Sequence, residues 1–127
     1  MRIIMDIDEL TKIVIGCAIE VHKTLGPGLL ESSYESCLIY ELCQAGLNVK
    51  NQVELPIIYK EQYIATGYKL DILLSNELII ELKAVDKLQP IHSAQLITYM
   101  KLSNINTGLL INFNTLKLVD GIKRFNL

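Results

Sequence analysis

The chain has 127 residues, of which 50% are hydrophobic and only 20% are charged. This composition excludes a disordered chain and fits one domain with its own hydrophobic core. Lys and Arg number 12 against 14 Asp and Glu, for a net charge of −2, which excludes a strongly basic nucleic-acid-binding chain. Any surface that binds phosphate must therefore be local.

The cysteines and the N-terminal segment indicate a cytoplasmic protein. Cys17, Cys37 and Cys43 form no CxxC pair, and their odd number fits reduced thiols. The opening segment MRIIMDIDEL carries acidic residues, and no stretch approaches the roughly 18 apolar residues of a membrane span. We therefore expect neither secretion nor a membrane partner, while the high apolar content leaves a homodimer open.

Two helices are predicted in the first third of the chain. From Asp8 to Leu25 the apolar residues recur at steps of three and four, which is typical of an amphipathic helix. Residues 26–28, Gly-Pro-Gly, end this helix, and a second helical pattern begins near Leu30 and ends at Gly46. The two helices are therefore expected to be joined by a tight turn.

The rest of the chain predicts a sheet and one further helix. After Gly46 the segments become shorter and rich in Val, Ile and Tyr, which favours strands. The predicted elements are, in order, a turn at 60–62, strands at 67–74 and 78–84 around a hairpin loop at 75–77, a helix at 93–102, a buried strand at 107–113 and an edge strand at 116–125. The fold class is therefore α/β, with 1–127 as a single domain.

Charged residues gather on one face of the predicted hairpin. If the hairpin turns about Asn76, Asp71 lies opposite Glu81 and Lys69 lies opposite Lys83. Because side chains alternate along a strand, these four charges then share one face. The apolar residues Leu70, Ile72, Ile80 and Leu82 are expected on the other face.

Such a face has the chemistry of a phosphoesterase site. Opposed side chains have Cβ atoms about 4.5–5.5 Å apart, close enough for Asp71 and Glu81 to hold one Mg²⁺ or Mn²⁺ ion. Lys83 can then orient the attacking water, and Lys69 can bind a neighbouring phosphate. The alternative is a solvated charge cluster, which the apolar runs around these residues disfavour, because unpaired charges are costly in covered strands.

Four segments in this order resemble the motifs of a known family. They are GLLESSY at 28–34, YKLD at 68–71, ELK at 81–83 and QLITY at 95–99. The chain resembles the GxxExxY proteins of the PD-(D/E)xK nuclease superfamily from about Leu10 to Phe125, although Leu70 stands where the motif has Pro. The resemblance implies a restriction-endonuclease-like αβββαβ core with a mixed central sheet flanked by helices.

The resemblance also implies roles for single residues. Asp71 and Glu81 would be metal ligands, the backbone carbonyl of Leu82 a third ligand, and Lys83 the catalytic lysine. Glu31 would be a helix-borne carboxylate beside the metal, where it can bind the ion or its water. The alternative for Glu31 is a favourable interaction with the N-terminus of its own helix.

Gln95 and Tyr99 are one helical turn apart, so both project to the same side of the predicted helix. In related exonucleases such a pair contacts the active centre or the DNA, and we expect both residues in the site. The alternative places Tyr99 in the core, with Gln95 capping a backbone group. His92 is interpreted as a polar neighbour outside the site, and His22 as a surface residue.

The sequence therefore predicts a metal-dependent nuclease that hydrolyses DNA phosphodiester bonds, in repair, recombination or defence, with RNA open as a substrate. The alternative is a non-catalytic nucleic-acid-binding or assembly module that keeps the fold, which the acidic net charge favours. Asp71, Glu81 and Lys83 together favour the enzyme. Six Tyr and two Phe residues are too few and too scattered to indicate a base-stacking platform.

Overall fold

The protein is described by a computed structural model that covers residues 5–127. In chain order the elements are α1 (Ile7–Leu25), α2 (Glu31–Gln44), β1 (Val49–Glu54), β2 (Ile57–Tyr59), β3 (Gln62–Ile64), β4 (Lys69–Leu74), β5 (Leu78–Lys83), α3 (Pro90–Ser103), β6 (Thr107–Asn112), η1 (Leu118–Gly121) and β7 (Ile122–Asn126). None of the helices in this range has the length and apolar character needed to cross a bilayer.

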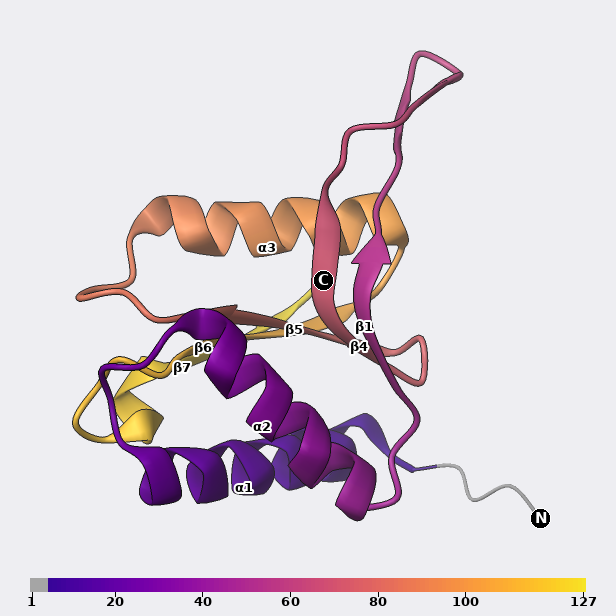
Figure 1. The fold of residues 1–127 in the computed structure, drawn as a ribbon. Helices are drawn as coiled ribbons and strands as arrows, with labels where there is room; N and C mark the ends of the chain where they lie inside the picture. The colour runs from indigo at the N-terminus through magenta and orange to yellow at the C-terminus, as the bar shows by residue number, and fades with distance from the viewer. Residues whose placement is uncertain (1–4) are drawn as a thin grey trace.

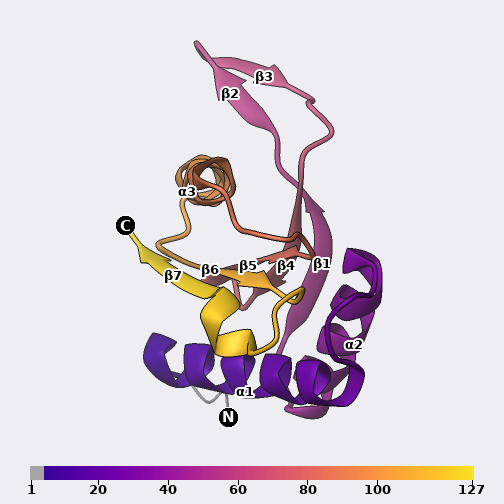
Figure 2. The ribbon, with the colours of Figure 1, turned by 90° about the vertical axis from the view of Figure 1, so that its left-hand side faces the viewer.

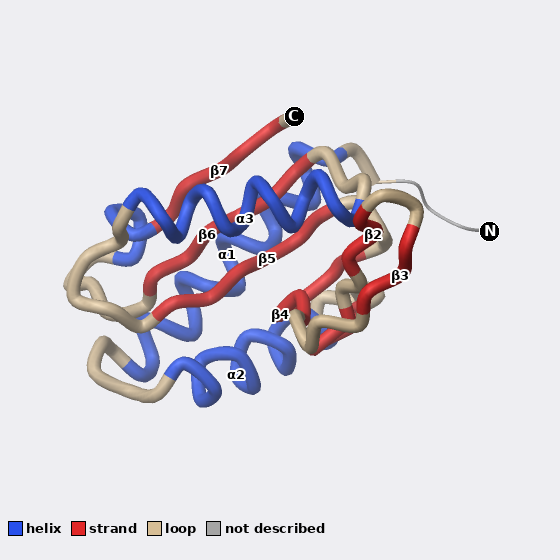
Figure 3. The backbone as a smooth tube through the Cα atoms, turned by 90° about the horizontal axis from the view of Figure 1, so that it is seen from above, coloured by secondary structure: helices blue, strands red, loops and turns tan. Residues whose placement is uncertain are grey.

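A five-stranded mixed sheet forms the middle layer, with the strand order β1-β4-β5-β6-β7. Helix α3 covers one face, while α1 and α2 cover the other (Figures 1 and 2). Seen from above, α3 lies along β5 and β6 (Figure 3). The α/β class with a mixed central sheet flanked by helices is thus confirmed.

The hairpin of β4 and β5 has the predicted register. Ile72 pairs with Ile80, and Leu74 pairs with Leu78. The loop between the strands is the predicted 75–77, in which Ser75 and Asn76 have positive φ and the Glu77 N–H donates to the Leu74 carbonyl at 2.9 Å. From β5 the chain passes through α3 and returns as β6, parallel to β5. Both strands are almost entirely buried because helices cover both faces of the sheet.

Helix α3 begins at Pro90, three residues before the predicted start. Gln89 and His92 form a reciprocal capping box, in which the Gln89 N–H donates to His92 Nδ1 at 3.0 Å. Proline suits the first helical turn because its missing N–H would have no partner there. His92 is therefore a capping residue, which agrees with its exclusion from the predicted site.

Two predictions near the C-terminal strand were wrong. The first half of the predicted edge strand forms η1, and β7 begins only at Ile122; a Cβ on Gly121 would overlap the carbonyl oxygen of Asn112. His22 is buried and not on the surface, because its Nε2 lies 2.7 Å from the carbonyl oxygen of Thr115. This hydrogen bond ties α1 to the segment that precedes η1.

The strands β2 and β3 form a separate two-stranded arm, which projects from the main sheet (Figure 2). Lys60 and Glu61 make the predicted turn at its tip, with φ of 49° and 67°. Ile58, Tyr59 and Tyr63 are largely exposed on the arm. The sequence predicted strands in this region but not their separation from the main sheet.

Tyr34 holds the turn between α1 and α2. Its ring stacks on Phe113 with ring centroids 4.6 Å apart. Its hydroxyl donates to the carbonyl oxygen of Gly26 at 2.6 Å and accepts from the N–H of Leu29 at 3.1 Å. The tyrosine of the segment at 28–34 therefore fixes the turn that presents Glu31 at the start of α2.

Replacing Tyr34 by Phe keeps the ring stack and removes both hydrogen bonds. We expect the free energy of unfolding to fall by about 1–3 kcal/mol, because two backbone groups near the core lose their partner. Urea unfolding measures the change. Tyr40→Phe, at a tyrosine that is 62% exposed, is the control; equal stability of the two variants would show that the hydroxyl does not hold the turn.

Candidate active site

The candidate site lies where β4 and β5 stop pairing. Their last pair is Ile72 with Ile80, and the next opposed residues are Asp71 and Glu81. Glu81 Oε1 accepts from the Asp71 N–H at 3.2 Å, and Asp71 Oδ2 accepts from the Leu82 N–H at 2.9 Å. The two carboxylates therefore satisfy backbone donors at the end of the ladder, which is what brings them together.

The carbonyl of Leu82 faces the same space. In an extended strand the N–H and C=O of one residue point to the same side. Because the Leu82 N–H points to Asp71, its carbonyl also faces β4, beyond the last pair of the ladder. The structure thus gathers two carboxylates and one carbonyl oxygen.

No cation of residues 5–127 lies at ion-pair distance from this acidic pair, in which Glu81 is buried and Asp71 is half-buried. Glu81 is only 5% exposed, and the only ion pair within residues 5–127 joins α1 to β7. Burial, reinforced by the charge of Asp71, raises the pKa of Glu81 to about 8. Burial also raises the pKa of Asp71, against the lowering effects of the Leu82 N–H and of Lys83. A bound divalent cation would compensate this excess negative charge.

Helix α2 brings two further carboxylates to the site. Glu31 is the first residue of α2 and Glu35 follows one turn later, and both line a groove of about 450 Å³ together with Asp71. Burial, then repulsion from Asp71, raises the pKa of Glu31. Burial likewise raises the pKa of Glu35. Glu35 was not among the predicted site residues, although its spacing of four residues from Glu31 was a usable signal.

Lys83, Gln95 and Tyr99 form a chain of hydrogen bonds. Lys83 Nζ donates to Gln95 Oε1 at 3.4 Å, and Gln95 Nε2 donates to the Tyr99 hydroxyl at 3.0 Å. Gln95 thus contacts two side chains and does not cap a backbone group, while Tyr99 is 7% exposed. The Lys83 charge lowers the pKa values of Asp71 and Glu81 against the effect of burial. The lysine therefore acts on the acidic pair through its charge, although its own hydrogen bond is to Gln95.

A buried asparagine fixes the chain just beyond Lys83. Asn112 is 2% exposed. Its Oδ1 accepts from the Val85 N–H at 3.0 Å, and its Nδ2 donates to the Val85 carbonyl at 2.9 Å. These two bonds hold the backbone two residues after Lys83, so β5 keeps its course to the end of the site.

Gln52 of β1 lies opposite Asp71 and interrupts the pairing of β1 with β4. The two strands pair on both sides of this position but not at it, and Gln52 has a φ of 51°, which is uncommon for a residue with a side chain. Its Nε2 donates to Glu35 Oε1 at 2.7 Å and to Asp71 Oδ1 at 3.5 Å. Nothing in the sequence pattern indicated this role.

The same irregularity corrects the predicted alternation of β4. Leu70 was expected on the face of Ile72, but it packs with Leu73 in the core beneath α3. Ile72 packs in the core formed with α1 and α2. The faces change because only residues 72–74 of β4 pair with β5, whereas residues 69–70 pair with β1 alone.

Lys69 lies outside this hydrogen-bonded cluster. It is exposed and pairs with Glu54 of β1. The β4–β5 ladder has already ended at Ile72, so Lys69 is not paired with Lys83 as the hairpin register predicted. Its contact with a phosphate stays a prediction, at a position apart from this cluster.

The donor set fits a hard cation such as Mg²⁺. Within residues 5–127 no group of three or more His, Cys, Asp or Glu side chains forms a ready metal cage. Mg²⁺ does not need one, because it is usually bound by one or two carboxylates and completes its octahedron with water and phosphate oxygens. Asp71, Glu81, the Leu82 carbonyl and the nearby Glu31 supply only oxygen donors.

The sequence was compared with known families and proteins. Residues 8–125 match the family model described as the PD-(D/E)XK nuclease superfamily. No curated protein and no solved structure matches the chain.

The raised pKa of Glu81 predicts a pH-dependent stability for the metal-free protein. Its pKa is about 8 in the folded state and 4.5 ordinarily, so the folded state binds more protons in this range and stability falls as pH rises. Each pKa unit corresponds to about 1.4 kcal/mol. We expect Glu81→Gln to flatten this decline and to be more stable than the wild type at pH 8.

Thermal unfolding across this pH range, with EDTA or with Mg²⁺, measures the effect. Added Mg²⁺ should stabilise the wild type at pH 8 but not Glu81→Gln, because a ligand stabilises the state that binds it. Glu77→Gln, in the exposed hairpin turn, is the matched control. Parallel pH profiles for Glu81→Gln and Glu77→Gln would contradict the assignment.

The positive φ of Gln52 leads to a second prediction. In strands alanine is normally more stable than glycine, but a positive φ costs a residue with a Cβ about 1–2 kcal/mol. We therefore expect Gln52→Gly to be more stable than Gln52→Ala by about 1 kcal/mol in urea unfolding. The same pair of substitutions at the neighbouring Asn51 should give the opposite order. Failure of this reversal would show that the backbone at Gln52 is not strained.

Proposed function

The chain belongs to the PD-(D/E)XK nuclease superfamily, and on this premise we propose that it is a metal-dependent nuclease that hydrolyses DNA phosphodiester bonds in repair, recombination or defence. The observation that carries the proposal is the half-buried Asp71 beside the buried Glu81 and near Lys83, with no counter-ion among residues 5–127 at ion-pair distance. Burying two like charges costs stability, so their retention favours a role in chemistry.

Asp71, Glu81 and the Leu82 carbonyl would hold Mg²⁺ or Mn²⁺, which when bound supplies an activated water and neutralises charge on the phosphate. Lys83 donates a hydrogen bond from Nζ to the attacking water or to a phosphate oxygen. Gln95 fixes the position of Nζ through its own hydrogen bond. Glu31 accepts a hydrogen bond from water in the groove that it lines.

Within the superfamily we assign the chain to the GxxExxY proteins. Each residue of that motif has a local role in this chain. Gly28 has a φ of 101°, which favours glycine; Glu31 lines the acidic groove; Tyr34 anchors the turn between the two helices. The three residues of the motif together hold the Glu31 carboxylate at the site.

DNA is the proposed substrate because the chain has the Gln95 and Tyr99 pair that related exonucleases direct at the active centre or the DNA, joined here to Lys83. A module that only binds nucleic acid would need neither the buried acidic pair nor the adjacent lysine. We further propose that residues 1–127 form one nuclease domain that acts in the cytoplasm, in line with its three free thiols.

The proposal predicts divalent-dependent cutting of labelled linear, nicked or single-stranded DNA, with RNA as a parallel substrate. Asp71→Ala and Lys83→Ala should each reduce the rate by at least about 100-fold, the usual effect of losing a group that acts in the transition state. Lys83→Ala should still bind the metal, whereas Asp71→Ala should not. Lys101→Ala, at an exposed position of α3, should cut normally.

Two results together would overturn the proposed function. One is the absence of cutting on every DNA and RNA substrate with Mg²⁺ or Mn²⁺. The other is equal metal binding by the wild type and Asp71→Ala, measured by titration calorimetry. That combination would leave a binding or assembly module as the better account of the site geometry.

A further inference from the structure

A second groove lies between α3 and the root of the arm, where Leu55 and Tyr68 connect the arm to the main sheet. Ile57 and Tyr68 line it on the side of the arm, and one stripe of α3 that includes Ile91, Thr98 and Leu102 lines the other side. Its volume is about 310 Å³. Tyr68 is 49% exposed and Ile91 is 69% exposed. The groove is therefore open, largely apolar and bounded by an aromatic ring.

This groove is continuous with the candidate active site. Gln95 and Tyr99 line the groove, and they are also the two residues that continue the hydrogen-bonded chain from Lys83. The ring centroids of Tyr68 and Tyr99 are 5.9 Å apart at an interplanar angle of 49°. A strand with one phosphate at Lys83 can thus place a neighbouring nucleotide against Tyr68.

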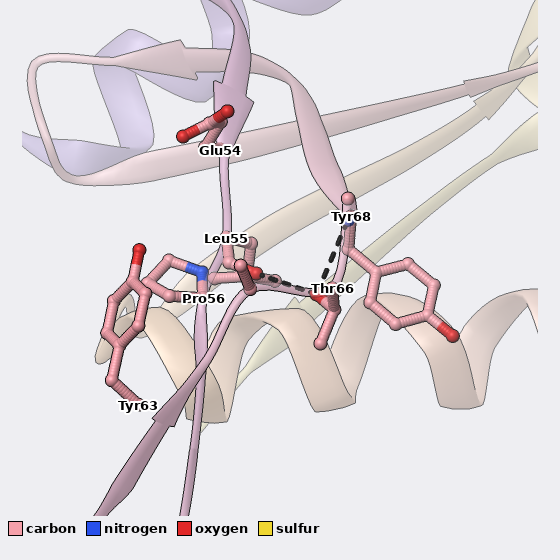
Figure 4. A pocket seen from close by; sticks show the side chains of 8 residues that line it. Glu54, Leu55, Pro56, Tyr63, Thr66 and Tyr68 are labelled. Atoms are coloured by element: carbon pink, nitrogen blue, oxygen red, sulfur yellow. Dashed lines mark hydrogen bonds between the residues drawn. The ribbon is translucent and has the colours of Figure 1, made fainter.

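The root of the arm holds Tyr68 in a defined position. The Leu55 N–H donates to the Tyr68 carbonyl at 2.9 Å, and the Thr66 hydroxyl donates to the Leu55 carbonyl at 3.3 Å and accepts from the Tyr68 N–H at 3.4 Å. Figure 4 shows that the rings of Tyr63 and Tyr68 point to opposite sides of this root. These bonds fix the backbone of Tyr68, so less conformational freedom remains to be lost when a ligand stacks on its ring.

We propose that this groove binds an unpaired nucleobase of the strand being cut, with Tyr68 as the stacking surface; the inference rests on the proposed function and adds the substrate class. Every base offers a π-face, and stacking on an aromatic side chain contributes about 1–3 kcal/mol per base. Within a duplex those faces are covered by neighbouring base pairs. The groove therefore selects single strands, frayed ends or flaps over intact duplex.

The fold brings Tyr68 and Tyr99, which looked scattered in the sequence, together in this groove. Tyr59 and Tyr63 lie further out on the arm and do not line it. Lys60 adds a cation near the tip, with its Nζ 5.4 Å from the centroid of the Tyr59 ring. The competing occupant is a second copy of this chain, because exposed apolar patches also form dimer interfaces. Continuity with Lys83 through Gln95 and Tyr99 favours the nucleobase.

The test measures binding in a Lys83→Ala background with Mg²⁺, which should hold the ion without cutting. The probes are fluorescent oligo-dT and a blunt duplex, followed by fluorescence anisotropy. Tyr68→Ala should weaken oligo-dT binding about 5- to 100-fold, as the loss of one stacked base predicts, and leave duplex binding unchanged. Ile91→Ala, at an exposed position of the same groove, should also weaken it, whereas Tyr68→Phe and Tyr63→Ala should bind as the parent does.

Three results would overturn the proposal. They are no binding of oligo-dT by the parent protein, equal weakening by Tyr68→Ala and Tyr63→Ala, or a dimer in sedimentation that Ile91→Ala dissociates and oligo-dT does not affect. Because this readout needs no cleavage, a protein that cuts nothing but loses oligo-dT through Tyr68→Ala would contradict the nuclease function alone. A protein that cuts normally but binds through other residues would contradict the nucleobase site alone.

Discussion

The divergence of β4 from β5 is the constraint on which the site depends. The ladder between the two strands ends at the pair of Ile72 and Ile80. Beyond this pair, the backbone N–H groups of Asp71 and Leu82 donate to carboxylate oxygens and not to the facing strand. Beyond this point β5 continues beside β6, while β4 continues beside β1 toward the arm. One separation of strands thus creates the acidic pair, leaves a carbonyl facing it and sends the arm out beside α3.

The same region stores free energy that a stability-optimised protein would not keep. The carboxyl groups of Asp71 and the buried Glu81 lie close together, and Gln52 has a positive φ, which is unfavourable for a residue with a side chain. The Gln52 amide offsets part of this cost by donating to Glu35 and Asp71. Backbone strain and charges without a counter-ion tend to persist where the surrounding structure holds a binding site in place for its ligand. Here the buried sheet and three helices provide that support.

The sequence predicted those parts of the site that depend on local periodicity. A turn about Asn76 fixed the register that brings Asp71 toward Glu81, since alternation along a hairpin depends only on where it turns. Gln52 and Glu35 could not be found in this way, because their contacts join β1, α2 and β4 across the fold. The change of face at Leu70 likewise arises from tertiary twisting that a period of two does not encode.

The root of the arm separates the exposed tip of the arm from the candidate active site. Leu55 and Tyr68 are joined by a backbone hydrogen bond, so the hairpin beyond them is a loop whose ends are already fixed. Insertions or exchanges at its Lys60–Glu61 tip leave the strands below unaltered, as exposed loop tips generally allow. Evolution, or an engineer, can therefore lengthen or replace the tip to change what the molecule reaches while the candidate active site stays the same.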